Sequence, residues 1–268
     1  MRRARFAVVS SMLALGLVVP SPLSAQGGRA GGPPVPGQPP SAQAAAPIDL
    51  IGYWVSIVNE DWRWRMVTPP KGDFPGLPLN QEGQRAANAW DPATDGSCLA
   101  YGAAGLLRMP GRLHVTWEND NTLKIETDAG VQTRRLNFGP PPATPGATSL
   151  QGYSRAEWER AGRGAGGRGG RAGGGAVGPG AGSMGGNLKV VTTNLSGGWV
   201  RKNGVPYSDQ TTLTEYFDRF PAPNGEEWLV VTTVMTDPRY WTGDFVTSTH
   251  FRRERDGSKW DPLPCRAS

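Results

Sequence analysis

The sequence predicts an all-β protein, built as a single antiparallel β-barrel or a β-sandwich, with one or two short helices and a disordered glycine-rich insertion. Many strand-length segments are rich in Thr, Val and aromatic residues, turn residues separate them, and helix signals are few. We favour the barrel because closure removes the exposed strand edges that a secreted β-protein must otherwise protect.

Residues 1–25 have the features of a signal peptide. Arg2, Arg3 and Arg5 precede the apolar run 6–19, and small residues follow up to Ala25, after which we expect cleavage. The apolar run is shorter than the roughly 20 residues that span a bilayer. We therefore expect an exported protein, periplasmic or extracellular, that is soluble after cleavage and has no stable membrane insertion.

Two low-complexity tracts delimit the ordered domain. Residues 26–48 are almost entirely Gly, Pro, Ala, Gln and Ser, which bury little apolar surface, so we expect a disordered linker. Residues 161–186 form a Gly- and Arg-rich tract, which we interpret as a disordered insertion in a surface loop. The predicted β-domain covers residues 49–268, interrupted by this insertion.

The strands are clearest in residues 111–138. In "RLHVTW" and "TLKIET" apolar residues alternate with polar ones on either side of a turn at 119–121. A second turn at 128–130 leads into 131–138, which completes a three-stranded antiparallel meander. Further predicted strands are 49–56, 59–66, 187–195, 211–220, 227–235 and 244–254.

Two segments predict helices. Residues 80–90 begin with Asn80, a good N-cap, and stop at an Asp-Pro pair. Residues 154–161 begin with Ser and have Glu three residues later, which is a capping-box pattern.

The formal net charge of +5 does not predict nucleic-acid binding. Seven of the 28 basic residues lie in the signal peptide, the linker and the glycine-rich tract, which contain no acid, so 21 basic residues face 23 acidic ones elsewhere. A phosphate-binding surface needs a clustered basic excess. We expect no nucleic-acid partner.

Cys98 and Cys265 are the only cysteines, and in an oxidising compartment a single distant pair most simply forms a disulfide. A metal site or a nucleophilic cysteine is the alternative. Two thiols with two histidines and no CxxC spacing disfavour zinc. We expect no metal and no cofactor.

Tryptophans supply the predicted ligand site. In "NEDWRWRM", read as a strand, Trp62, Trp64 and Met66 share one face. Such a face either fills a narrow lumen as core or lines a cavity for a ligand, and both readings stay open. Trp54 and Trp117, on other predicted strands, complete this candidate set.

The triplet Gly52-Tyr53-Trp54 resembles the Gly-x-Trp signature of lipocalins and other calycin barrels. In that class the Trp closes the barrel floor, and an Arg near the end of the last strand packs over it. The resemblance implies a lipocalin-like barrel in which Arg252, or its neighbour Arg253, is the barrel-closing arginine.

Longer strings, among them "EDWRWRMVTPPKGD", "TWENDNTLKIETDAGVQTR" and "RKNGVPYS", resemble an uncharacterised family of exported bacterial β-rich proteins. That family brings no assigned activity. The resemblance therefore implies no functional residues.

Glu215 is the most informative acid. It shares a strand face with Leu213 and Phe217, and if that face points inward, burial raises the carboxyl pKa and suits acid/base chemistry. In the opposite orientation Tyr216 lines the lumen and Glu215 is solvated. His250 is a second catalytic candidate, although no motif pairs it with a nucleophile or a metal.

The polar loop 201–210 offers Arg201 and Tyr207 as residues at a barrel mouth, where loops commonly carry function. A plain connecting loop is the alternative.

These observations predict an exported protein that binds a small apolar or aromatic ligand in a Trp-lined cavity, because ten tryptophans occur without a catalytic motif. A hydrolase or isomerase of a hydrophobic substrate, with Glu215 as acid/base, is one alternative. A carbohydrate or cell-envelope binding module with exposed Trp62 and Trp64 is the other. The sequence leaves the ligand and the oligomeric state open.

Overall fold

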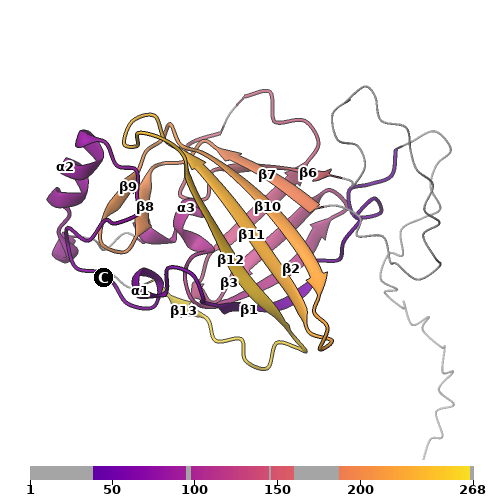
Figure 1. Cartoon of the computed structure of the whole chain (residues 1–268). Coiled ribbons are helices and arrows are strands. Elements are labelled where there is room, and N and C mark those ends of the chain that lie inside the picture. The colour runs from indigo at the N-terminus through magenta and orange to yellow at the C-terminus, as the bar shows by residue number, and fades with distance from the viewer. Residues whose placement is uncertain (1–38, 95–97, 145, 160–186, 266–268) are drawn as a thin grey trace, which may run out of the picture. The chain divides into compact units, whose positions relative to one another are not determined.

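A closed nine-stranded β-barrel forms the body of the protein (Figure 1). The computed structural model describes residues 39–94, 98–144, 146–159 and 187–265. The order around the barrel is β1, β12, β11, β10, β7, β6, β5, β3 and β2. These strands are β1 (Gly52–Ile57), β2 (Arg112–Asn119), β3 (Thr122–Thr127), β5 (Thr133–Phe138), β6 (Tyr153–Glu159), β7 (Asn187–Thr193), β10 (Thr212–Pro221), β11 (Glu227–Thr236) and β12 (Phe245–Glu254).

The strand pairing confirms the all-β barrel and rules out the sandwich. Neighbouring barrel strands are antiparallel except β5 and β6, which run parallel with Leu136 opposite Ser154. Lipocalins are eight-stranded up-and-down barrels. The ninth strand and the parallel pair therefore separate this topology from the lipocalin one. The predicted meander is confirmed as β2, β3 and β5.

The lumen is filled by alternate side chains of the strands. Because successive residues of a strand point to opposite faces, every second residue is buried, as in β11, where Leu229, Val231 and Met235 are at most 1% exposed. Trp54, Phe217 and Phe251 are equally buried. Burial of so many apolar side chains is the main source of the barrel's stability.

The two ends of the barrel differ. The aromatic end, named for Trp117, Phe138 and Trp158, lies where β1 begins and β12 finishes. The arginine end, named for Arg65, Arg108 and Arg201, lies at the opposite rim and carries the remaining helices and strands (Figure 1).

Short elements cover the arginine end. Figure 1 shows α2, α3, β8 and β9 gathered there. The hairpin β8–β9 packs with α3 and with the start of β10 in one apolar cluster that includes Val200, Val205 and Leu213. The helices and the additional strands are α1 (Trp62–Arg65), α2 (Gln81–Ala89), α3 (Ala103–Leu106), two 3₁₀ turns (Pro92–Thr94 and Leu99–Tyr101), β4 (Ala129–Gly130), β8 (Gly198–Arg201), β9 (Val205–Tyr207) and β13 (Leu263–Pro264).

One helix prediction is confirmed and the other is wrong. Helix α2 starts after Asn80, whose Oδ1 accepts a hydrogen bond from the Gly83 amide at 2.9 Å. Residues 154–159, by contrast, belong to strand β6. There Ser154, Ala156 and Trp158 alternate inward, because pairing with β5 and β7 outweighs a local capping pattern.

The predicted strand at 59–66 is also wrong. Asp61 adopts the left-handed conformation (φ 47°), and its carbonyl accepts the Trp64 and Arg65 amides, which starts the one-turn helix α1. Four alternating Trp and Arg residues are compatible with the two-residue period of a strand and with one turn of a helix. The left-handed conformation of Asp61 and the hydrogen bonds to its carbonyl decide for the helix.

The expected linker is shorter than predicted, because residues 39–48 pack on the barrel. Trp158 Nε1 donates to the Ala42 carbonyl at 2.8 Å, and the Ala42 amide donates to Asn121 Oδ1 at 2.9 Å. The Gln43 amide donates to the Asp120 carbonyl at 3.0 Å. The signal peptide, most of the linker and the glycine-rich insertion lie outside the described residues.

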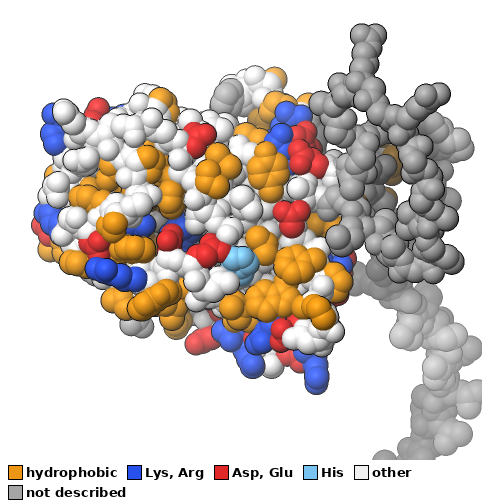
Figure 2. Space-filling view, viewed as in Figure 1, with side chains coloured by type: hydrophobic (Ala, Val, Ile, Leu, Met, Phe, Trp, Pro, Cys, Tyr) orange, Lys and Arg blue, Asp and Glu red, His pale blue; other side chains and the backbone are white. Residues whose placement is uncertain are grey.

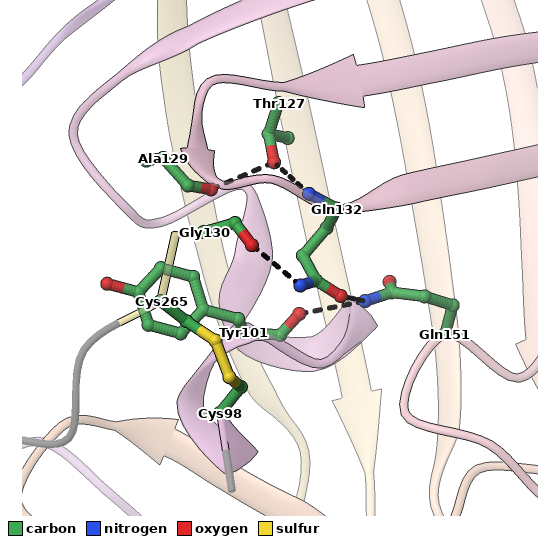
Figure 3. Close-up of a disulfide and its surroundings, with 8 residues drawn as sticks. All are labelled: Cys98, Tyr101, Thr127, Ala129, Gly130, Gln132, Gln151 and Cys265. Carbon is green, nitrogen blue, oxygen red and sulfur yellow. Dashed lines mark hydrogen bonds between the residues drawn. A yellow bond between two sulfur atoms is a disulfide. The ribbon is translucent and has the colours of Figure 1, made fainter. Parts of the chain in front are cut away.

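Cys98 and Cys265 form the predicted disulfide, with Cα atoms 5.6 Å apart (Figure 3). Strand β13 runs parallel to β4 and ends just before Cys265. This pairing places Cys265 beside Cys98, which directly precedes the 3₁₀ turn Leu99–Tyr101. Gly130 has φ +79°, and a Cβ there would collide with the Tyr101 ring. This site therefore favours glycine.

The surface mixes charges. Figure 2 shows Lys and Arg side chains interspersed with Asp and Glu over the visible face, with apolar side chains between them. Among the described residues, no helix is both long and apolar enough to cross a membrane.

Candidate functional site

An open pocket of about 470 Å³ lies at the aromatic end. One wall is the chain that leads into β1, with Ile48, Leu50 and Ile51, and the other comes from the barrel rim. Its rim residues are Trp117, Leu123 and Trp158. Gln43 and Asp49 supply polar groups at the edge.

Three aromatic rings in tilted contact hold the rim in place. The Phe138 ring lies between the two tryptophans, with its centroid 5.7 Å from Trp117 and 5.2 Å from Trp158. These rings come from the ends of β2, β5 and β6, so strand pairing fixes their spacing. Tilted aromatic pairs at such distances add to the stability gained by burial. The pocket wall is therefore preformed.

The residues 39–51, which we call the cover segment, form the second wall. Asp49 shapes the segment locally, because its Oδ1 accepts the Ile51 amide at 2.9 Å. Arg253 holds the same region, since its Nη2 donates to the Ile51 carbonyl at 2.7 Å and lies 3.3 Å from Asp49 Oδ2. The cover segment is thus tied to the barrel by hydrogen bonds between its backbone and the side chains of Trp158, Asn121, Trp54 and Arg253.

Arg253, and not Arg252, is the arginine that lies over the buried tryptophan. Its guanidinium carbon is 5.6 Å from the Trp54 ring centroid, and the two residues are opposite each other on β12 and β1. Arg252 points outward to Glu226, at 2.9 Å. Alternation along β12 explains the correction, because neighbouring residues point to opposite faces.

The tryptophans of α1 do not line the lumen. Trp62 and Met66 are 65% and 58% exposed. The Trp64 ring is half-buried beneath the guanidinium of Arg201, at 4.7 Å from the ring centroid. The carbohydrate hypothesis required two exposed tryptophans side by side, and only Trp62 meets that requirement.

The expected loop residues Arg201 and Tyr207 are buried at the arginine end. Burial raises the pKa of the Tyr207 phenol above its usual range. The Tyr207 hydroxyl lacks a hydrogen-bond partner among the described residues, and a Cβ at Gly102 or Gly198 would collide with it. Tyr216 lies on the outer face of β10 and is half-buried. Neither tyrosine reaches the aromatic-end pocket.

Glu215 points inward, but its neighbour is a cation. Arg134 Nη1 and Nη2 donate to Glu215 Oε1 and Oε2 at 2.9 and 2.6 Å, and both side chains are at most 1% exposed. Arg134 Nη2 also donates to Thr192 Oγ1 at 3.2 Å. Both carboxylate oxygens are occupied and shielded from solvent. This arrangement offers no route for a substrate to a free acid or base.

His250 lies on the outer face of β12 beside Glu60. Its Nδ1 is 2.8 Å from Glu60 Oε1, but the two groups are not aligned as a hydrogen bond. The Ser248 hydroxyl donates to the same oxygen at 2.6 Å. His114 stacks on Tyr53 with ring centroids 4.2 Å apart. The structure does not bring His250 near Glu215, which is buried in the lumen.

Sequence reasoning missed Trp158, Phe138 and the cover segment. Period-two alternation of small and aromatic residues in "YSRAEWE" was the available signal for Trp158. The composition of residues 39–48 gave no signal that this segment packs on the barrel. Among the expected ligand-binding residues, Trp117 lines the pocket.

No group of three or more potential metal-ligating side chains comes together in the part of the chain that the structure describes. Comparisons of the chain with protein-family models, with curated proteins and with solved structures found no match.

Proposed function

We propose that the protein is an exported binding protein that holds a small apolar or aromatic ligand in the aromatic-end pocket. The observation that carries this proposal is the pair Trp117 and Trp158, which face the apolar side chains of the cover segment across about 470 Å³. Small-molecule sites are typically concave, mostly apolar and about 300–1,000 Å³ in volume. The proposed ligand is therefore of the same chemical class as the sequence predicts, but its site is at the rim of the barrel and not inside the lumen.

The composition of the pocket favours binding over catalysis. Apolar side chains dominate its walls, and Asp49 is already engaged by the Ile51 amide and by Arg253. A flat aromatic guest packed against the rim tryptophans gains burial and ring contacts. Asp49 and Gln43 at the edge suit a guest with one polar end. An enzyme based on Glu215 has less support, because that carboxylate is occupied by Arg134.

The proposal is tested with a neutral fluorescent probe, N-phenyl-1-naphthylamine, titrated into the mature protein. We expect saturable 1:1 binding that Trp158→Ala weakens roughly 10-fold or more, because burial of a large apolar side chain contributes about 1.5–3 kcal/mol. Trp117→Ala should have a similar effect. Trp62→Ala is the matched control and should leave the affinity within about 2-fold, since an exposed indole on α1 makes no pocket wall.

Far-UV circular dichroism of each variant shows whether the barrel is intact. Binding that Trp62→Ala weakens as much as Trp158→Ala does, or absence of saturable binding, would refute the proposal. Mass spectrometry of small molecules released on denaturation of the protein then gives the chemical class of the natural guest.

A further inference from the structure

Three arginines from separate segments are buried together at the arginine end. Arg65 lies in α1, Arg108 precedes β2, and Arg201 ends β8. They are 5%, 6% and 3% exposed. Buried cations are normally paired with carboxylates, because an unpaired charge is costly to remove from water.

One of the three arginines has such a partner. Arg108 Nη2 is 2.7 Å from Asp61 Oδ2, and its Nη1 donates to Thr247 Oγ1 at 2.6 Å. Arg65 donates through Nε to the Arg108 carbonyl at 2.9 Å. Arg201 donates through Nη1 to the Pro75 carbonyl at 3.1 Å. Within the described residues, neither Arg65 nor Arg201 has a carboxylate at ion-pair distance.

Three buried N–H groups of this cluster have no acceptor in the described part of the chain: Trp64 Nε1, Arg65 Nη1 and Arg201 Nε. Buried donors are almost always satisfied, so an unsatisfied donor calls for an explanation such as a missing ion or ligand. All three groups are donors, and two belong to cations. The group that would satisfy them is an anion with several acceptor oxygens.

The electrostatics of the cluster agree with this geometry. Burial, and next the charge of Arg108, lower the pKa of Arg65 to about 10, and the same causes lower that of Arg201 to about 10. Both therefore stay charged at neutral pH. Arg108 repels both, so Arg65 and Arg201 each lie within electrostatic range of Arg108. Nearby acids, Glu60 and Asp61 for Arg65 and Asp61 and Asp73 for Arg201, offset part of this effect.

A surface pocket of about 520 Å³ adjoins Arg108. Its lining includes Asp61, Phe245 and Thr247, and all three side chains also contact Arg108. Asp61 and Thr247 do so through the bonds given above, and the Phe245 ring centroid lies 5.3 Å from the guanidinium carbon. Asp61 is 29% exposed and holds a left-handed backbone conformation, which is uncommon outside glycine. Its carboxylate thus lies between solvent and Arg108.

We propose that the arginine end binds an oxyanion, the carboxylate or phosphate group of a small ligand, and that the Asp61 carboxylate occupies Arg108 until this ligand displaces it. Guanidinium groups bind both oxyanions through paired N–H bonds, which are stronger than neutral hydrogen bonds. Glu60 and Ser248, which also line the pocket, are bonded to each other, and among the described acids Asp61 is the one at ion-pair distance from Arg108. The site is independent of the aromatic-end pocket.

The proposal is tested by isothermal titration of the mature protein with inorganic phosphate and, separately, with benzoate, at constant ionic strength. We expect saturable binding of at least one of them, and the stronger of the two identifies the class of oxyanion. Arg201→Gln should weaken it about 10-fold or more, because a charge-assisted hydrogen bond is lost. Arg135→Gln, the same change at an exposed arginine on β5, is the control and should bind as the wild type does.

Asp61→Asn is the second variant, and it should bind the anion more tightly than the wild type, because Arg108 loses its internal competitor. Misfolding cannot produce such a gain. No saturable binding of either anion, or equal weakening by Arg201→Gln and Arg135→Gln, would overturn the site. An unchanged or weaker affinity of Asp61→Asn would overturn the displacement by Asp61.

Discussion

The two ends of the barrel are closed in different ways. At the aromatic end a single segment crosses the rim, held by side chains that include Trp158 and Arg253, and it leaves a pocket against Trp117 and Trp158. At the arginine end several short elements and a disulfide pack tightly, and charged side chains are buried among them. One end has an open pocket, and the other buries two arginines, Arg65 and Arg201, that have no carboxylate at ion-pair distance among the residues that the structure describes.

The lumen follows the same division. Around Trp54 and Phe217 it is apolar. Towards the arginine end a polar layer crosses it, where Arg134 contacts Glu215, Ser154 and Thr192. This polar layer lies between two separate apolar clusters, one that contains Trp54 and one that contains Leu213. The three predictions below test this contrast, beginning with the largest expected effect.

Replacement of Arg134 by Met should lower the free energy of unfolding by about 3–5 kcal/mol, because it leaves the buried Glu215 carboxylate without its partner. Urea denaturation of the folded protein measures this loss. Arg135→Met, at the next position on β5, is the matched control, and its exposed pairing with Glu118 predicts little change.

The double replacement Arg134→Met with Glu215→Leu sharpens the test. It removes both charges, so it should recover part of the stability that the single replacement loses. Equal effects of Arg134→Met and Arg135→Met would contradict the polar layer. The same reasoning makes Glu215→Gln an unsuitable probe of catalysis, because it destabilises the fold whatever the function.

Reduction of the disulfide should loosen the arginine end more than the aromatic end. The bridge closes a sequence separation of 167 residues, and loss of a native disulfide typically costs about 2–5 kcal/mol. Amide hydrogen exchange should rise in the segment after Cys98 and in β4, beside which Cys265 is held. A double Cys→Ser variant is the control. If reductant raised its amide hydrogen exchange as much as that of the wild type, loss of the disulfide could not be the cause.

Acid should weaken the aromatic end through Glu227. Hydrogen bonds, first from Arg253 and then from Arg219, hold the pKa of Glu227 below its usual range. A folded-state pKa below the unfolded value contributes stability above about pH 4, which is lost as the pH falls through the folded pKa. Glu227→Gln should therefore be less stable than the wild type at pH 7, and the difference should shrink towards pH 3.

Urea unfolding at a series of pH values measures that difference. Glu157→Gln, the same change at an exposed carboxylate on β6, is the control and should show a smaller one. A Glu227→Gln deficit that stays constant from pH 7 to pH 3 would contradict the assigned cause.

Local patterns were enough for the all-β class, for the meander β2–β3–β5 and for helix α2, because alternation and an N-cap act over a few residues. They were insufficient for α1 and β6, each of which fits more than one period over so few residues. In both cases the partners that decide the structure are distant: Arg65 bonds to the carbonyl of Arg108, and β6 pairs with β7 across the insertion.

By itself the sequence determined the fold class, the pairing of the two cysteines and the expectation of aromatic ligand chemistry. Only the tertiary structure decided where the tryptophans point, that Arg253 covers Trp54, and that Arg134 neutralises Glu215. The physical reason is separation along the chain: Arg134 and Glu215 are 81 residues apart, and barrel closure brings them together. Strand periodicity reports which residues share a face, whereas a buried charge or a pocket depends on what the opposite wall supplies.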